Sequence, residues 1–92
     1  MKKEYLLEND KISQKIKLLD EGKIIGYINY EVINNQINLN YIFVDPRYRG
    51  QGLTTMLMDY LIDFIRMNNY KAIPICTVIK GIIQKPKYSD VL

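Results

Sequence analysis

Apolar and polar residues alternate along the first half of the chain in three successive runs, at residues 12–19, 24–33 and 36–44. Alternation with a period of two is typical of strands that bury one face. The residues expected on the buried faces are Ile12, Ile16, Leu18, Ile24, Ile28, Tyr30, Val32, Ile37, Leu39, Tyr41 and Phe43. Turn-forming residues separate the runs. The pattern therefore predicts an antiparallel meander, with residues 5–7 as a candidate for a short edge strand.

The second half of the chain changes to a helical period. After a glycine-containing turn, apolar residues recur at spacings of three and four, which places them on one stripe of an α-helix. The stripe consists of Leu53, Met56, Leu57, Tyr60, Leu61, Phe64 and Ile65. We expect this helix to end near Asn68 and Asn69, because asparagine can adopt the left-handed conformation of a helix cap.

A fourth strand is predicted at residues 70–76, followed by a short helix at residues 78–84 that ends before Pro86. Pro74 has no N–H group, so the pairing of this strand must fail on one side there. A right-handed strand–helix–strand crossover makes the fourth strand parallel to the third. We therefore predict one α/β (α+β) domain, residues 1–92, with a mostly antiparallel sheet of about four strands, a β-α-β crossover, one long helix and a short C-terminal helix.

The junction between the third strand and the long helix is the candidate ligand site. Gly50 and Gly52 allow backbone conformations and close approaches that other residues do not. The unpaired N–H groups of the first helical turn and the helix dipole suit a phosphate or pyrophosphate, and Arg47 and Arg49 add positive charge. The stretch is neither a dinucleotide fingerprint, which needs a third glycine where Thr55 stands, nor a P-loop, which needs Gly-Lys-Ser/Thr.

Composition narrows the possible chemistry. The chain has no histidine and a single cysteine, Cys76, which argues against metal sites, Ser-His or Cys-His nucleophiles and disulfides. Its net charge is +3, but no basic helix face stands out, so we expect no nucleic-acid binding. No apolar run approaches a membrane span of ~20 residues. Met1–Glu4 lacks the apolar core of a signal peptide, so a cytoplasmic location is expected.

The loop Arg47-x-x-Gly50-x-Gly52 matches the pattern Arg/Gln-x-x-Gly-x-Gly/Ala and is followed at once by the long helix. It resembles the acetyl-CoA pyrophosphate loop of the GCN5-related N-acetyltransferases (GNATs). The resemblance runs from about Ile12 to the C-terminus and includes Ile73-Pro74-Ile75-Cys76 and a Pro-x-Tyr ending at Tyr88. These features look like the small YjdJ-type branch of that superfamily, in which the acceptor-side elements are trimmed away.

The resemblance implies that acetyl-CoA or CoA binds with its pyrophosphate on residues 49–54 and its pantetheine between the strands that end at Val44 and Cys76. The implied cofactor-binding residues are Val44, Arg47, Arg49, Gly50, Gln51, Gly52, Leu53, Thr54 and Thr55. Cys76 is implied as the catalytic residue. Relatives carry a histidine and an acidic residue where this chain has Tyr41 and Phe43. Tyr41 is therefore our candidate general acid toward the CoA thiolate, and Glu31 a candidate base.

Plainer interpretations stand beside these roles. A lone cysteine in an apolar strand is usually a small buried hydrophobe, an alternating Tyr41 a cross-strand packing residue, and Glu31 a solvated charge. The placement of Cys76 at a strand end beside the glycine loop would instead expose it to a thioester.

Three functions remain open: an N-acetyltransferase that passes acetyl to an unknown amine on a small molecule or a protein, directly or through Cys76; a CoA-binding sensor or interaction module; and an interaction domain whose glycine loop is only a turn. We expect a monomer or weak dimer that does not associate with membranes.

Overall fold

The computed structural model describes residues 4–92, so residues 1–3, which belong to the predicted domain and to the Met1–Glu4 segment, lie outside the described residues. Its strands are β1 (Leu6–Asp10), β2 (Lys15–Asp20), β3 (Lys23–Ile33), β4 (Gln36–Val44) and β5 (Lys71–Pro74). Its helices are α1 (Leu53–Asn68) and α2 (Thr77–Ile83), with single 3-10 turns η1 (Pro46–Tyr48) and η2 (Ser89–Val91). No helix within residues 4–92 is long and apolar enough to cross a membrane.

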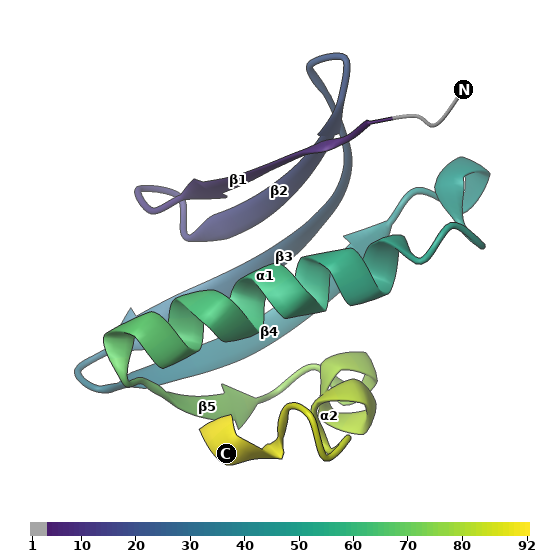
Figure 1. Cartoon of the computed structure of the whole chain (residues 1–92). Helices are drawn as coiled ribbons and strands as arrows, with labels where there is room; N and C mark the ends of the chain where they lie inside the picture. Colours follow the sequence, from purple (N-terminus) through teal and green to yellow (C-terminus); the bar gives the residue numbers. More distant parts are fainter. Residues whose placement is uncertain (1–3) are drawn as a thin grey trace.

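The strands form one five-stranded sheet in the order β1-β2-β3-β4-β5 (Figure 1). The first four are antiparallel, and α1 carries the chain over to β5, which pairs parallel to β4. The predicted α+β class with its crossover is confirmed. The candidate edge strand at residues 5–7 is part of a longer β1, which pairs with β2 from Leu6↔Leu19 to Asp10↔Lys15.

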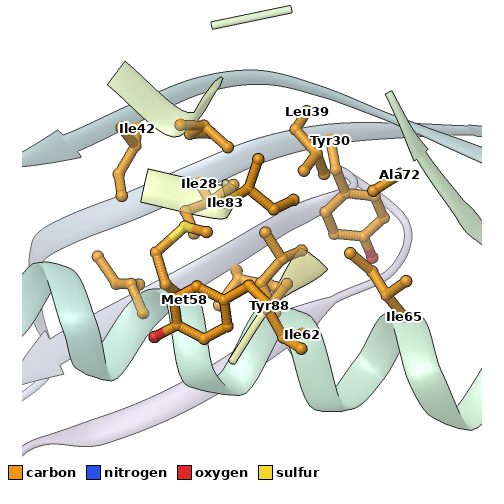
Figure 2. Packing of buried hydrophobic residues seen from close by; sticks show 14 of the residues in the cluster. Ile28, Tyr30, Leu39, Ile42, Met58, Ile62, Ile65, Ala72, Ile83 and Tyr88 are labelled. Atoms are coloured by element: carbon orange, nitrogen blue, oxygen red, sulfur yellow. The ribbon is translucent and has the colours of Figure 1, made fainter. Parts of the chain in front are cut away.

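A single hydrophobic core lies between the sheet and α1, which crosses one face of the sheet (Figures 1 and 2). α2 and the C-terminal segment add Ile79, Ile83, Tyr88 and Val91 to the same cluster. The buried stripe of α1 consists of Leu53, Leu57, Met58, Leu61, Ile62 and Ile65. The sequence prediction had placed Met56 in this stripe and left out Met58, but Met56 is 37% exposed and Met58 is fully buried.

Two β-bulges change which side chains face the core. In β4 the register passes from Asn29↔Tyr41 to Tyr30↔Leu39, so Asn40 has no partner on β3. The extra residue moves Ile42 and Val44 into the core and turns Tyr41 to the opposite face, where it is 48% exposed. The prediction that Tyr41 and Phe43 share the buried face with Leu39 was wrong for this reason.

The first strands differ from the prediction in a similar way. A bulge opposite Leu18 and Leu19 buries Ile25 and leaves Ile24 44% exposed. Ile12 is 99% exposed because it lies in the turn between β1 and β2, and not in the strand where the alternation had placed it.

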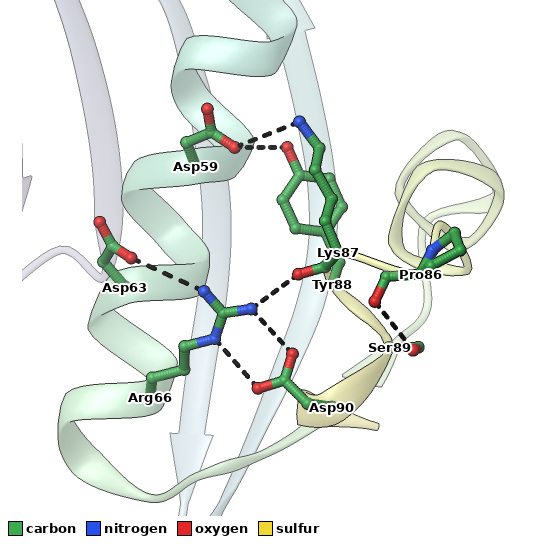
Figure 3. A network of polar contacts seen from close by, with 8 residues as sticks. All are labelled: Asp59, Asp63, Arg66, Pro86, Lys87, Tyr88, Ser89 and Asp90. Carbon is green, nitrogen blue, oxygen red and sulfur yellow. Dashed lines mark hydrogen bonds and ion pairs between the residues drawn. The ribbon is translucent and has the colours of Figure 1, made fainter.

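The ends of the helical region are fixed by named contacts. Asn69 adopts the predicted left-handed conformation, with φ 55°, and its N–H donates to the carbonyls of Arg66 and Ile65. Arg66 also forms two hydrogen bonds with the carboxylate of Asp90, at 3.0 and 2.8 Å, and the Tyr88 hydroxyl donates to Asp59 (Figure 3). The C-terminal segment is thereby attached to α1.

Candidate functional site

The parallel strands β4 and β5 separate halfway along β4. Their pairing runs from Gln36↔Lys71 to Leu39↔Pro74, where the proline lacks a donor, as the sequence predicted. The N–H groups of Ile75 and Cys76 then both donate to the carbonyl of Leu39, at 3.0 and 2.9 Å. Beyond this point β4 continues without β5 beside it, which opens a cleft between the end of β4 and the start of α2.

The cleft has a volume of about 370 Å³. Its lining residues come from β4, from the loop before α1 and the first turn of that helix, and from the segment that begins α2: Tyr41, Ile42, Phe43, Val44, Arg49, Thr54, Cys76 and Val78. The Asp45 N–H donates to the carbonyl of Ile25 at 2.7 Å and so points towards β3. Because backbone groups alternate along a strand, those of Val44 point towards the cleft instead.

The glycine loop borders this cleft through Thr54 and Arg49. Gly50 and Gly52 have φ angles of 83° and 76°, in the left-handed region. None of the N–H groups of residues 50–55 donates a hydrogen bond to another residue of the described chain, and no side chain caps α1. A Cβ built on Gly50 or Gly52 would meet no heavy atom within 4 Å apart from its chain neighbours. The loop therefore presents free donors at the positive end of a 16-residue helix, which is an anion-binding arrangement.

The two arginines of the loop have different environments. Arg49 lines the cleft, and its Nε donates to the carbonyl of Val44 at 3.2 Å. The guanidinium of Arg47 is bound to Asp45, with Nε–Oδ1 at 3.2 Å and Nη2–Oδ2 at 2.8 Å, and lies outside the cleft lining. These hydrogen bonds lower the pKa of Asp45 to about 2. Arg47 thus stabilises the turn, while Arg49 adds its charge to the cleft.

The remaining predicted cofactor residues occupy both sides of the loop. Leu53 is buried and anchors α1 in the core, whereas Thr55 is exposed. The carboxamide oxygen of Gln51 accepts a hydrogen bond from the Tyr5 hydroxyl at 2.6 Å, so the loop is connected to the start of β1. Nothing in the sequence pattern indicated this contact, because the two residues are 46 positions apart.

The structure brings together the two predicted catalytic residues. Tyr41 and Cys76 both line the cleft, Tyr41 from β4 and Cys76 from the N-cap position of α2, where it is partly buried against the core. Glu31 is exposed on β3 and is not among the lining residues. The lining contains no carboxylate, and among the residues described no group of three or more His, Cys, Asp or Glu side chains could hold a metal.

The fold of this chain is similar to those of known structures. The solution structure of a GCN5-like protein from Staphylococcus aureus matches with a TM-score of 0.76 and 29% identity, over 94% of this chain and 85% of that one. The ribosomal-protein-S18-alanine N-acetyltransferase from Escherichia coli matches with a TM-score of 0.53 and 29% sequence identity. The match covers 71% of this chain and 37% of that enzyme. The GNAT family N-acetyltransferase YhbS from Escherichia coli, solved in complex with CoA, matches with a TM-score of 0.59 and 25% sequence identity. The match covers 65% of this chain and 38% of that protein.

The chain thus spans little more than a third of the two Escherichia coli enzymes. No curated protein sequence matches it. The sequence profile of the GCN5-related N-acetyl-transferases matches residues 15–91, a span that includes the glycine loop and Cys76. By this match, together with the sheet that separates beside a glycine loop, the chain belongs to the GCN5-related N-acetyltransferase family.

Proposed function

We propose that this chain is an acetyl-CoA-dependent N-acetyltransferase of the small YjdJ-type branch, with CoA bound in the cleft between β4 and α2. The observation that supports this best is the row of unused N–H donors at residues 50–55, which borders the cleft. A diphosphate needs several converging donors, and a helix N-terminus supplies them together with a favourable dipole. Arg49 contributes the side-chain charge, and Arg47 holds the preceding turn through Asp45.

The rest of the cofactor follows from the shape of the cleft. The pantetheine arm would run from the loop along the end of β4 towards Cys76. The thioester carbonyl would then lie near the backbone of Val44, whose N–H faces the cleft. A donor placed at the developing oxyanion stabilises the transition state of acyl transfer.

Two routes for the acetyl group fit this cleft. In the direct route the neutral amine attacks the thioester carbonyl, the C–S bond breaks, and Tyr41 protonates the departing CoA thiolate. The amine proton passes to solvent, and Tyr41 takes up a proton from solvent to complete the cycle. In the second route the thiolate of Cys76 attacks first and CoA leaves, so that an acetyl-cysteine thioester forms. The amine then attacks that thioester and the Cys76 thiol is regenerated.

The cofactor site is tested by titrating the protein with CoA while recording its backbone amide signals. We expect the signals of residues 50–55 to move most, because their donors acquire an acceptor. Pantetheine, which lacks the diphosphate, is the matched control and should leave these signals in place. CoA at one hundred times its dissociation constant should add about 2.7 kcal/mol to the free energy of unfolding. Unmoved amides with no thermal stabilisation would refute the proposal.

A CoA-binding module without turnover is the second candidate. This candidate is favoured because the cleft lining has no carboxylate, and the chain has no histidine, that could accept the amine proton. Release of CoA from acetyl-CoA in the presence of amines separates the two. Steady release that Cys76→Ala abolishes, with an acetyl group found on the intact wild-type protein, supports the cysteine route. Release that survives in Cys76→Ala supports direct transfer, and tight binding without release supports the module.

A further inference from the structure

The face of the sheet opposite α1 carries an aromatic cluster that the core does not use. Because of the bulge in β4, the side chains of Tyr27, Tyr41 and Phe43 project from this face together with those of Lys15 and Lys17. None of these residues belongs to the core cluster or packs against it. We name Tyr27, Tyr41 and Phe43 the aromatic face.

The three rings of the aromatic face form one continuous surface. The ring of Tyr27 lies 5.5 Å from that of Phe43 and 6.1 Å from that of Tyr41, centroid to centroid, with interplanar angles of 36° and 48°. Tyr27 and Phe43 are direct cross-strand partners, and Tyr41 is the diagonal neighbour of Tyr27. Tilted rings at these distances leave their electron-rich faces accessible to a cation.

A cation already occupies this surface. The ammonium of Lys15 lies 4.7 Å from the centroid of the Tyr27 ring. The cross-strand partner of Lys15 on β1 is Asp10, yet the Asp10 carboxylate pairs with Lys17, at 3.0 Å. The alkylammonium group of Lys15 therefore lies over the ring, while the neighbouring carboxylate is bound to a different lysine.

The aromatic face is continuous with the cleft, because Tyr41 and Phe43 belong to both. An amine that reaches a thioester beside Cys76 from the open side of the sheet would pass over these rings. We propose that the aromatic face is the acceptor site and that it binds the alkylammonium group of a lysine-like primary amine, a proposal that rests on the acetyltransferase function given above. The bound ammonium gives up its proton to solvent, and the neutral amine then attacks the thioester. Lys15 imitates this ligand and is displaced by it.

Choline and its neutral isostere 3,3-dimethyl-1-butanol test the charge recognition without acetylation. We expect the ring-proton signals of Tyr27, Tyr41 and Phe43 to move with both ligands, with choline bound about two- to fivefold more tightly, as a cation–π contact at an exposed site provides. Lys15→Ala removes the internal competitor and should tighten choline binding by a further factor of about two to five, without tightening binding of the isostere. Lys71→Ala, which removes a lysine charge at an exposed position of β5, should change neither affinity.

The ring itself is tested by a second pair of variants. Tyr27→Phe keeps the aromatic ring and should keep the preference for choline, whereas Tyr27→Leu should lose it. Equal affinity for choline and the isostere, or no gain in Lys15→Ala, would overturn the acceptor site, and the Lys15→Ala result does not depend on whether the Tyr27 variants fold. The CoA titration is independent of these measurements. Moved amides at residues 50–55 with no preference for choline would refute only the acceptor site, whereas unmoved amides would refute the acetyltransferase function.

Discussion

Replacing Gly50 or Gly52 by alanine distinguishes two roles of the glycine loop, namely binding a ligand and only turning the chain. Gly22, in the turn between β2 and β3, has a φ of 82°, close to the 83° and 76° of Gly50 and Gly52. At all three positions a Cβ would meet no heavy atom within 4 Å beyond its chain neighbours. Gly22→Ala is therefore a matched control, with the same backbone strain and the same absence of a clash, away from the cleft.

The expected loss of stability is the same for the three variants. A residue with a Cβ in the left-handed region costs roughly 1–2 kcal/mol. For a domain of this size each kcal/mol lowers the melting temperature by about 4–8 °C. The expected loss of CoA affinity differs, because a methyl group at position 50 or 52 occupies the space beside the free donors. One charge-assisted hydrogen bond lost costs about 1.5–3 kcal/mol, which is about ten- to a hundredfold in the dissociation constant.

Calorimetric titration with CoA and thermal unfolding of the same samples measure both effects. Gly22→Ala should melt earlier than the wild type and bind CoA as tightly. Gly50→Ala and Gly52→Ala should melt earlier by a similar amount and bind about ten- to a hundredfold more weakly. If these two variants lose stability but keep the wild-type affinity for CoA, the donors at residues 50–55 do not hold the diphosphate.

Three further predictions concern charges and the C-terminal contact. Arg49→Gln should weaken CoA binding about tenfold, because one charge-assisted contact is lost. Arg47→Gln removes a guanidinium that is already bound to Asp45, so it should change the CoA affinity less than about threefold. Titration calorimetry measures both affinities. The pKa of Asp45 is about 2 in the folded chain, below its ordinary 3.8, so this carboxylate contributes stability above about pH 4 that is lost as the pH falls through 2. The difference in unfolding free energy between wild type and Asp45→Asn should therefore shrink between pH 5 and pH 2, and a constant difference in denaturant titrations would contradict this. Tyr88→Phe removes the hydroxyl that donates to Asp59 and should cost about 1 kcal/mol in the same titrations, with CoA affinity unchanged. An unchanged stability would show that solvent replaces that contact.

The sequence predicted the elements that depend on local chemistry. The alternation in β2 to β4, the helical stripe of α1 and the cap at Asn69 each follow from a pattern within a few residues. The two glycines and the break at Pro74 are equally local, and both take the predicted form. Asn69, the two glycines and Pro74 each act through the backbone preference of one residue.

The faces of β4 could not be predicted because its last residues are apolar on both sides. Tyr41 and Phe43 continue the alternation set by Leu39, but Ile42 and Val44 would form an equally good apolar face. The bulge at Asn40 decides between them, and a bulge at asparagine has no signature in the apolar pattern. The choice is made by packing, because Ile42 and Val44 belong to the hydrophobic core while the rings of Tyr41 and Phe43 remain outside it.

The bulge and the proline act at the same level of the sheet, and together they determine what the cleft offers. Pro74 ends the pairing of β5 with Leu39, and Asn40, the next residue of β4, is the bulged one. Beyond this level one edge of β4 has no strand partner, a condition that usually invites aggregation. Here Ile42 and Val44 hold the free segment onto the core, so its backbone remains ordered while its N–H groups face the cleft. The break at Pro74 thus leaves backbone donors free at the edge of β4, and the bulge at Asn40 places the rings of Tyr41 and Phe43 on the open face of the sheet. The proposed thioester and acceptor sites depend on these two features together.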